Sequence, residues 1–575
     1  MFYCVNLLSW LLSEPHYYTR MHLCTSCKLN VMKSFITYIL ALTLCLPSFA
    51  YGQEQQLHQF IDQQIADATS RPLAQPSTDA EFLRRIYLDL VGQIPTALEA
   101  EQFIGDSSRA KRAKLIDTLL ADPRYTRRMT EFFNVMLMER RGADDNWERF
   151  LRTSFENNTS WDQLVRDIVS PDTSNEDSRG SAYFLTKRLE KYGQNPTDFP
   201  GLARDIGRMF LGMDLACAQC HDHLFIDDYK QADFQGLFAF INNSFIRRDT
   251  DFPAIGMQPV KAKLEFNSVF EEGAFSTGPK LPGLTEIPIP EFVAGEEFAI
   301  EPNKETKAPG VPKFNPLDYL AKQLPATTNE SFNLNAANRI WFLMMGRGLV
   351  HPLDLHHSDN PASHPDLLTH MANEFAAHNY NIKWLIREIA LSDTYQRTSV
   401  VSDGLADAKP KEFRIFHEKP MSAEQLMWSM LAATGQLNLL SADDNSSATA
   451  DPEAEEEPLL LGLDDIRTDF LAAFANPPRE PETDFAPSVR GALFVLNGPR
   501  VLSWIPAQPG NLAERLNQQS ANYANTLYLA VLSRHPTAVE QDHFDSFISN
   551  HPDKTAAIEQ AIWALLASNE FAINH

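Results

Sequence analysis

Apolar side chains recur at helical spacing through most of the chain. Phe82, Leu83, Ile86, Tyr87 and Leu90 are examples, each three or four positions from another member of the group. This is the spacing of one face of an α-helix, turned toward a core. The pattern predicts a mainly α-helical fold.

One stretch of this pattern occurs twice. Residues 87–99 (YLDLVGQIPTALE) align without gaps with residues 528–540 (YLAVLSRHPTAVE). Each copy has a Thr followed three positions later by a Glu, the capping-box arrangement that starts a helix. A further helix with a similar end follows each copy, closing at 119–125 (LLADPRY) and 565–571 (LLASNEF), and 384–395 is a looser relative. We therefore predict two related helical modules near the two ends of the mature chain.

Composition divides the chain into two predicted helical domains. The first spans residues 53–250 and the second residues 316–575. Residues 251–315, between them, are rich in Pro and Gly, which favours an irregular, partly β insertion. Within the second domain, residues 441–458 are rich in Asp, Glu and Ala, and this composition predicts a disordered loop without chemistry.

The N-terminal region contains a segment typical of a secretory signal peptide at residues 32–50. It starts with Met-Lys, continues with an apolar run and ends with small residues before a cleavage site after Ala50. The apolar run is too short to predict a membrane span. We expect a periplasmic or secreted protein without a span in the mature chain. Residues 1–31 lack this pattern and are interpreted as a mis-annotated upstream extension.

The charge of the chain excludes some partners. Its 575 residues include 50 Lys and Arg against 75 Asp and Glu, so the formal net charge is -25. Nucleic-acid binding needs a basic surface that neutralises phosphates, and attraction to anionic lipid needs positive charge as well. We therefore expect neither partner.

The main chemical motif is the cysteine motif, residues 217–221 (CAQCH). The other four of the six Cys lie in residues 1–50, so the mature chain keeps only this pair. Cys-x-x-Cys-His is the attachment pattern of a c-type haem, in which two thiols form thioethers with the porphyrin and the imidazole binds its iron. We expect one haem c, anchored by Cys217 and Cys220, with His221 as the iron ligand.

The second axial ligand has several candidates. Met257 lies in a Gly-Met-Gln-Pro segment that resembles a distal-methionine loop, and it is the speculative distal ligand. Met209, Met213 and His223 are the others, although His223 is close in sequence to the proximal histidine.

The same two cysteines allow three other interpretations. In an oxidising compartment Cys217 and Cys220 would form a structural disulfide. Together with His221 and His223 they would instead contribute to a zinc or other metal site. A redox-active dithiol is the third interpretation.

A second polar cluster, the histidine loop, occupies residues 351–365 (HPLDLHHSDNPASHP) and holds four His and two Asp. This composition suits a metal or substrate site. It also suits an ordered loop in which Ser363 precedes a helix that starts at Pro365. An enzyme acting on an extracellular polymer would use the loop from His351 to His364, and alanine variants of His356 and His357 would test that role.

Several long segments resemble a known family. FLRRIYLDLVGQIPTALEAEQFI and ARDIGRMFLGMDLACAQCHDHLFIDDYKQADFQGLFAFI are similar to the secreted planctomycete-type cytochrome-like domain (PSCyt). NPLDYLAKQL, MSAEQLMWSMLAATG and VRGALFVLNGP are similar to the uncharacterised domain (PSD) that usually follows it. The resemblance covers about residues 55–245 and 315–505. It implies export and a haem role for the cysteine motif, and relatives often accompany sulfatase-like or polysaccharide-degradation proteins.

These observations predict an exported cytochrome-like protein with one c-type haem site, suited to electron transfer with an outside redox partner. The alternative is a non-catalytic extracytoplasmic binding or scaffold protein with a Cys217–Cys220 disulfide, linked to polysaccharide degradation. The sequence assigns no enzymatic reaction.

Overall fold

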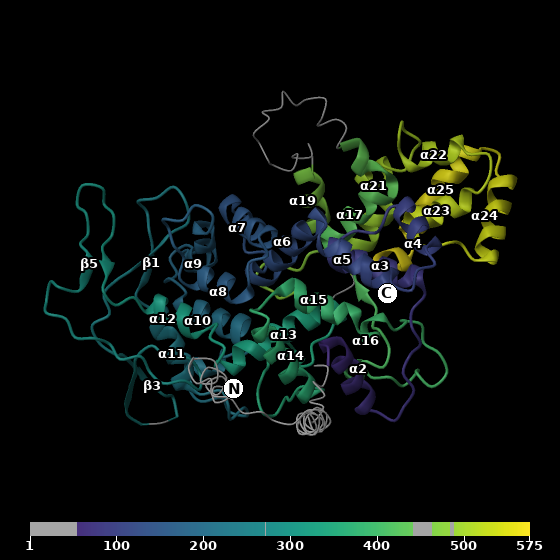
Figure 1. Ribbon diagram of the computed structural model, residues 1–575. Coiled ribbons are helices and arrows are strands. Elements are labelled where there is room, and N and C mark those ends of the chain that lie inside the picture. Colours follow the sequence, from purple (N-terminus) through teal and green to yellow (C-terminus); the bar gives the residue numbers. More distant parts are fainter. Residues whose placement is uncertain (1–54, 271, 441–462, 483–487) are drawn as a thin grey trace, which may run out of the picture. The chain divides into compact units, whose positions relative to one another are not determined.

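The computed structural model of the protein describes residues 55–440 except 271, residues 463–482 and residues 488–575 (Figure 1). Residues 56–575 belong to one compact unit. The predicted upstream extension, signal peptide and acidic loop lie outside the described residues.

The first half of the described chain is mainly α-helical, as the apolar periodicity predicts. Its helices and helical turns are α2 (Leu57–Asp67), α3 (Asp79–Val91), α4 (Ala97–Gly105), α5 (Lys111–Leu120), α6 (Pro123–Met138), α7 (Asp145–Glu156), α8 (Trp161–Val169), η1 (Arg179–Ala182), α9 (Tyr183–Leu189), α10 (Phe199–Ile206), η2 (Gly207–Leu211), η3 (Cys217–Gln219) and α11 (Gln231–Ile241).

The second half is helical as well. Its helices and helical turns are α12 (Pro316–Gln323), α13 (Glu330–Met345), α14 (Pro365–Ala377), α15 (Ile382–Leu391), α16 (Asp393–Gln396), η4 (Pro410–Glu412), α17 (Ala423–Thr434), α19 (Leu463–Phe474), α20 (Val489–Asn497), α21 (Pro499–Ser503), α22 (Leu512–Gln518), α23 (Tyr523–Leu532), α24 (Ala538–Asn550), α25 (Lys554–Leu566) and α26 (Asn569–Ala572). Within the described residues, no helix is both long and apolar enough to span a bilayer.

The strands form short antiparallel pairs. Five of them lie in the Pro/Gly-rich insertion, which confirms that this insertion is irregular and partly β. The pairs are β1 (Ser244–Ile246) with β2 (Ile255–Met257), β3 (Leu264–Asn267) with β4 (Ala274–Thr277), β5 (Phe298–Ile300) with β6 (Val311–Pro312), and β7 (Lys419–Pro420) with β8 (Ile573–Asn574).

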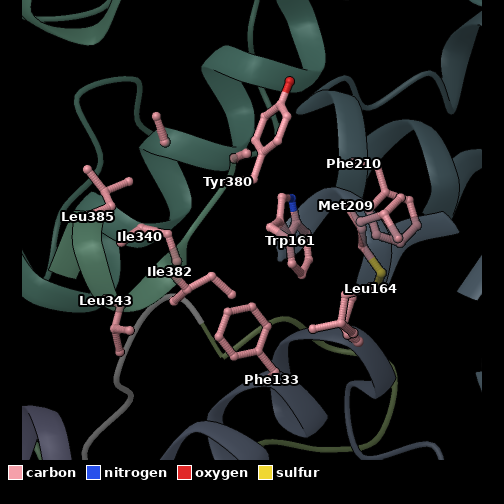
Figure 2. Packing of buried hydrophobic residues seen from close by; sticks show 14 of the residues in the cluster. Phe133, Trp161, Leu164, Met209, Phe210, Ile340, Leu343, Tyr380, Ile382 and Leu385 are labelled. Atoms are coloured by element: carbon pink, nitrogen blue, oxygen red, sulfur yellow. The ribbon is translucent and has the colours of Figure 1, made fainter. Parts of the chain in front are cut away.

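The largest hydrophobic core combines residues from both predicted domains (Figure 2). Trp161 lies near its centre, with its ring centroid 5.4 Å from that of Phe133 and 6.2 Å from that of Phe210. Its backbone N–H donates a hydrogen bond to the Tyr380 carbonyl at 3.0 Å. Because Ile340 and Tyr380 come from the second domain, the two halves bury their apolar faces against each other.

The two repeated modules adopt the same local structure. Helix α3 ends at Gly92 (φ 72°) and helix α23 ends at Ser533 (φ 61°), both in the left-handed conformation and at aligned positions. Thr96 caps α4 and Thr537 caps α24, each in a complete capping box with a Glu three residues later. Helix α4 packs against α23, and Figure 1 shows the α3–α4 module beside the α23–α25 region. The predicted repeat is a structural one.

Candidate functional site

The chain enters the cysteine motif through a helix that changes its winding. Helix α10 continues into a π-helical turn, η2, and stops at Gly212, which has a φ of 69°. Gly is required here because φ is positive and because a Cβ atom would lie 2.7 Å from the Cδ2 atom of His356. π-Helical turns occur frequently at functional sites. The entry to the motif is therefore held directly against the histidine loop.

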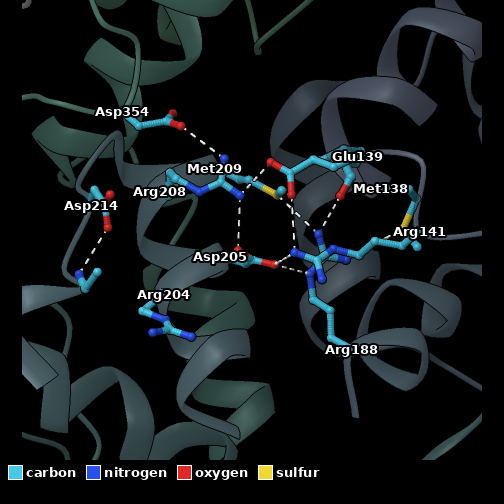
Figure 3. Close-up of polar contacts among 12 residues, drawn as sticks. Met138, Glu139, Arg141, Arg188, Arg204, Asp205, Arg208, Met209, Asp214 and Asp354 are labelled. Carbon is cyan, nitrogen blue, oxygen red and sulfur yellow. Dashed lines mark hydrogen bonds and ion pairs between the residues drawn. The ribbon is translucent and has the colours of Figure 1, made fainter. Parts of the chain in front are cut away.

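Buried charges fix this entry helix in place (Figure 3). Asp205, on α10, accepts hydrogen bonds from Arg188 at 2.7 Å, Arg141 at 2.9 Å and Arg208 at 3.1 Å. Burial alone would raise the pKa of Asp205, but the three arginines outweigh it and lower that pKa to about 2. Arg208 also bonds Asp354 of the histidine loop at 3.1 Å. The network ties the segment before the cysteine motif to both halves of the chain.

The cysteine motif itself begins with the helical turn η3 and packs against the N-terminal part of α11. Cys217 and Cys220 are exposed and are not bonded to each other. Between them, the carbonyl of Gln219 accepts a hydrogen bond from the buried amide of Gln235 at 2.9 Å. The Asp222 carboxylate accepts the backbone N–H that begins α11, at 2.8 Å. Hydrogen bonds to α11 thus hold the backbone of the motif, while both cysteines are exposed.

The ring of His221 has a defined hydrogen-bonding state. Its Nδ1 lies 2.6 Å from the backbone oxygen of Asp222. Because a carbonyl oxygen can only accept, Nδ1 carries the hydrogen and Nε2 keeps a free lone pair. A metal-bound histidine is commonly oriented in this way, with one nitrogen held by a carbonyl and the other on the metal.

Exposed apolar side chains surround the motif. Leu224 is 63% exposed, Phe225 83%, Val269 65% and Phe270 66%. The ring of Phe270 lies 4.7 Å from that of His221, and the backbone N–H of Val269 donates to the Cys220 carbonyl at 3.2 Å. Single exposed apolar residues are ordinary, but a group of large ones marks a binding surface. We call these four side chains the apolar rim.

The candidate distal ligands lie in different surroundings. Met257 is on β2 and is 5% exposed within the main core. Met209 and Met213 are also buried, with the Met209 sulfur 3.6 Å from an Arg188 nitrogen. His223 accepts the N–H groups of two following residues at its Nδ1, which closes a turn. A distal role for any of them stays a prediction.

The structure brings the histidine loop to the cysteine motif through Tyr229. The Tyr229 ring lies 6.0 Å from that of His223 on one side and 5.6 Å from that of His357 on the other. Its hydroxyl donates to the His356 carbonyl at 3.1 Å. The two polar clusters that the sequence singled out are therefore neighbours.

The histidine loop is partly bonded internally: Asn360 and His364 have partners within it, whereas Nδ1 of His357 has no hydrogen-bond partner in the described part of the chain. His356 is partly exposed, but desolvation of its ring together with Arg339 lowers its pKa to about 4, so it is neutral near pH 7. His364 is buried at the start of α14, with Nδ1 3.1 Å from the Ser363 hydroxyl. Across the described ranges, no three His, Cys, Asp or Glu side chains are grouped as they would be to hold a metal ion. This arrangement fits an ordered loop.

Sequence reasoning missed residues at the cysteine motif and residues around a separate cavity. Val269 and Phe270 reach the cysteine motif from the insertion, where composition gave no signal. A cavity lined by Asp89, Arg128 and Lys419 was missed as well. A signal existed for Asp89. It is an acidic residue flanked by Leu88 and Leu90, and the repeated copy has Ala530 at the aligned position.

Comparison with protein families identifies the chain. Residues 56–245 match PSCyt2, described as a protein of unknown function (DUF1549). Residues 318–548 match PSD1, also described as a protein of unknown function (DUF1553). The chain therefore belongs to the family of paired PSCyt and PSD domains that its sequence resembles. No curated protein and no solved structure gives a significant match.

Proposed function

We propose that this protein is an exported electron carrier with one haem c, bound through Cys217 and Cys220, with His221 as the axial ligand. The observation that carries the proposal is the hydrogen bond from His221 Nδ1 to the Asp222 oxygen. It leaves Nε2 available as a metal ligand, in a motif whose two cysteines are exposed and not bonded to each other.

Covalent attachment would use the thiols without any redox change. Each S–H adds across one vinyl group, so that a carbon–sulfur bond forms and the thiol hydrogen goes to the other vinyl carbon. When bound, the haem supplies reversible one-electron chemistry at its iron. His221 would supply the proximal nitrogen, and the Asp222 carbonyl would hold the imidazole in the required orientation.

The apolar rim supports a flat apolar group at this position. Phe270 exposes its ring 4.7 Å from that of His221, and Phe225 exposes its ring 6.4 Å from that of His223. Covering apolar surface contributes about 25 cal/mol per Å² removed from water. A porphyrin held over the motif would shield these rings, and its edge would stay accessible to a partner.

The charge of the protein indicates the kind of redox partner. A net charge of -25 favours encounter with a protein that presents a basic surface around its own cofactor. We expect electron exchange with such a partner to slow as ionic strength rises, because salt screens the attraction.

The test is expression of the chain in a strain that has periplasmic haem-attachment machinery. We expect intact mass to increase by one haem and the visible spectrum to show a Soret band. The double variant C217A/C220A should lose both signals. The matched control H543A should keep both, because His543 is exposed on α24 and is not among the haem-ligand candidates.

The opposite result would favour the alternative. A chain without added mass, in which peptide mapping finds Cys217 joined to Cys220, would reject the haem proposal. It would support a non-catalytic extracytoplasmic binding or scaffold protein stabilised by that disulfide, with its link to polysaccharide degradation to be tested by co-purification.

A further inference from the structure

A cavity of about 240 Å³ lies apart from the cysteine motif, with none of Cys217, Cys220 and His221 in its wall. Its wall comes from α3, α6, α13, α17 and the paired strands β7 and β8. The wall contains both charged and apolar side chains. One part consists of charged side chains, and another of apolar ones such as Phe132, Phe342 and Phe474.

Most of the charged groups in the wall neutralise one another. Lys419 Nζ lies 2.6 Å from an Asp89 oxygen. Arg208 pairs with Asp354 at 3.1 Å and with Glu139 at 2.6 Å. The wall also contains Glu131, which pairs with Arg467 at 3.6 Å, and Glu418.

A further acidic group of the wall is neutralised from outside it. Glu424 pairs with Arg140 at 2.7 Å. Arg140 also binds Glu482 at 2.6 Å, and Glu482 is itself part of the wall. Arg140 thus forms ion pairs with two carboxylates.

Arg128 is the exception among these lining cations. Its residue is 7% exposed, yet it makes no hydrogen bond or ion pair with any residue in the described part of the chain. Its guanidinium lies 5.7 Å from the Phe132 ring centroid, on the same wall. Arginine keeps its charge in proteins. Glu131, Asp89 and Glu424 favour its charge electrostatically but accept no hydrogen bond from it, so the guanidinium keeps N–H groups for an anion.

The backbone beside the cavity is also strained. Glu139 and Arg140 follow α6 with φ values of 46° and 55°. Two successive non-Gly residues in the left-handed region are uncommon, and such strain gathers at ligand sites. The ion pairs of Arg140 hold this conformation and keep Glu139 in the wall.

We propose that this cavity binds a small organic anion with an apolar body, whose carboxylate or sulfonate group lies on Arg128. Arginine presents parallel N–H groups that match the two oxygens of such an anion. The phenylalanine rings provide the surface for the apolar body. A cavity of about 150 Å³ is known to accept benzene, so this one has room for one ring and its acidic group.

The test uses the complete protein and benzoate as the probe, followed by calorimetric titration. We expect benzoate to bind and neutral benzamide, which has the same shape, to bind at least about tenfold more weakly. Charge-assisted hydrogen bonds of this kind account for about a tenfold to hundredfold change in affinity. Acetate should also bind more weakly than benzoate, because it lacks the ring. Benzenesulfonate has a sulfonate in place of the carboxylate, so comparing its affinity with that of benzoate shows which of the two groups the site prefers.

Two variants locate the site. R128Q should weaken benzoate at least about tenfold and leave benzamide unchanged. V135F keeps Arg128 and fills the cavity, because Val135 is part of the wall, so it should abolish binding of both. R149Q, on α7 and away from the cavity, is the matched control and should bind benzoate as the unaltered protein does.

Two results would overturn the proposal: no binding of benzoate or benzenesulfonate to the unaltered protein, or equal affinity for benzoate and benzamide. Unchanged benzoate affinity in folded R128Q would also reject it. If R128Q does not fold, the comparison of benzoate with benzamide and the V135F result still decide.

Discussion

The Tyr229 hydroxyl donates a hydrogen bond to the backbone oxygen of His356 at 3.1 Å. The two residues are 127 positions apart. The first follows the cysteine motif by eight residues and the second lies in the histidine loop. The position of the motif therefore depends on a contact with the second half of the chain.

Removal of that hydroxyl is expected to destabilise the protein. Y229F keeps the ring, which is fully buried, and leaves the His356 carbonyl without its donor. We expect a loss of about 1–2 kcal/mol in the free energy of unfolding, measured by urea denaturation. Y192F, at a tyrosine that is 48% exposed, is the control and should change little. Equal effects of the two variants would show that the contact contributes nothing.

Stability should fall on acidification because His356 is desolvated and neutral in the folded protein. Its pKa is about 4 in the folded protein, whereas an unfolded histidine has a pKa of about 6.5. The unfolded state thus binds the proton first, and the contribution that is complete above about pH 6.5 is lost progressively toward pH 4. The expected loss is about 3 kcal/mol.

The variant H356N isolates this contribution. Arg339, Asp354 and His357 are the charged or titratable groups that act on His356, and the variant leaves all three in place. Unfolding followed between pH 4 and pH 7 should show a shallower pH dependence in H356N than in the unaltered protein. If stability depended on pH equally in H356N and in the unaltered protein, His356 would not have a lowered pKa in solution.

The two capping boxes should contribute alike. T96A and T537A each remove a side-chain oxygen that accepts an N–H group at the start of a helix. We expect each to cost about 1 kcal/mol of stability, measured by thermal or urea unfolding. T96S and T537S keep the oxygen and are the controls. A large cost in one module and none in the other would contradict the structural equivalence of the repeat.

The stability of the protein should depend on the Asp205 carboxylate, which holds the charge network before the cysteine motif together. D205N leaves Arg188 and its neighbours without their shared carboxylate, and we expect a cost of about 3–5 kcal/mol. D117N is the matched control, because Asp117 is 52% exposed and pairs with Arg387, which is 38% exposed. An exposed pair contributes about 0–1 kcal/mol. A D205N protein as stable as D117N would show that the network is dispensable.

Local chemistry explains what could be predicted from sequence. The repeat was predictable because capping boxes and apolar spacing act over a few residues, and Gly92 and Ser533 end their helices in the same conformation. The cysteine motif was equally visible. Its apolar rim was only half visible, because Leu224 and Phe225 adjoin the motif while Phe270 arrives from a separate hairpin connection.

Contacts between distant residues explain what could not be predicted. The Tyr229–His356 bond depends on how two halves of the chain pack, and no periodicity encodes it. Arg128 lies on a helix rich in arginine, where sequence alone does not tell which one lacks a partner. The charged cavity became apparent only once α3, α6 and the last strand were placed together.

The last strand, β8, has a consequence for biosynthesis. Asn574 is 2% exposed and donates to the Asp89 carboxylate at 2.7 Å, across 485 positions of sequence. A nascent chain therefore displays Asp89 and its helix long before the residues that cover them exist. Closing so long a loop is entropically expensive, so we expect this strand to dock late in folding. A protein shortened by its last two residues should remain largely helical and yet expose the Asp89 carboxylate to solvent.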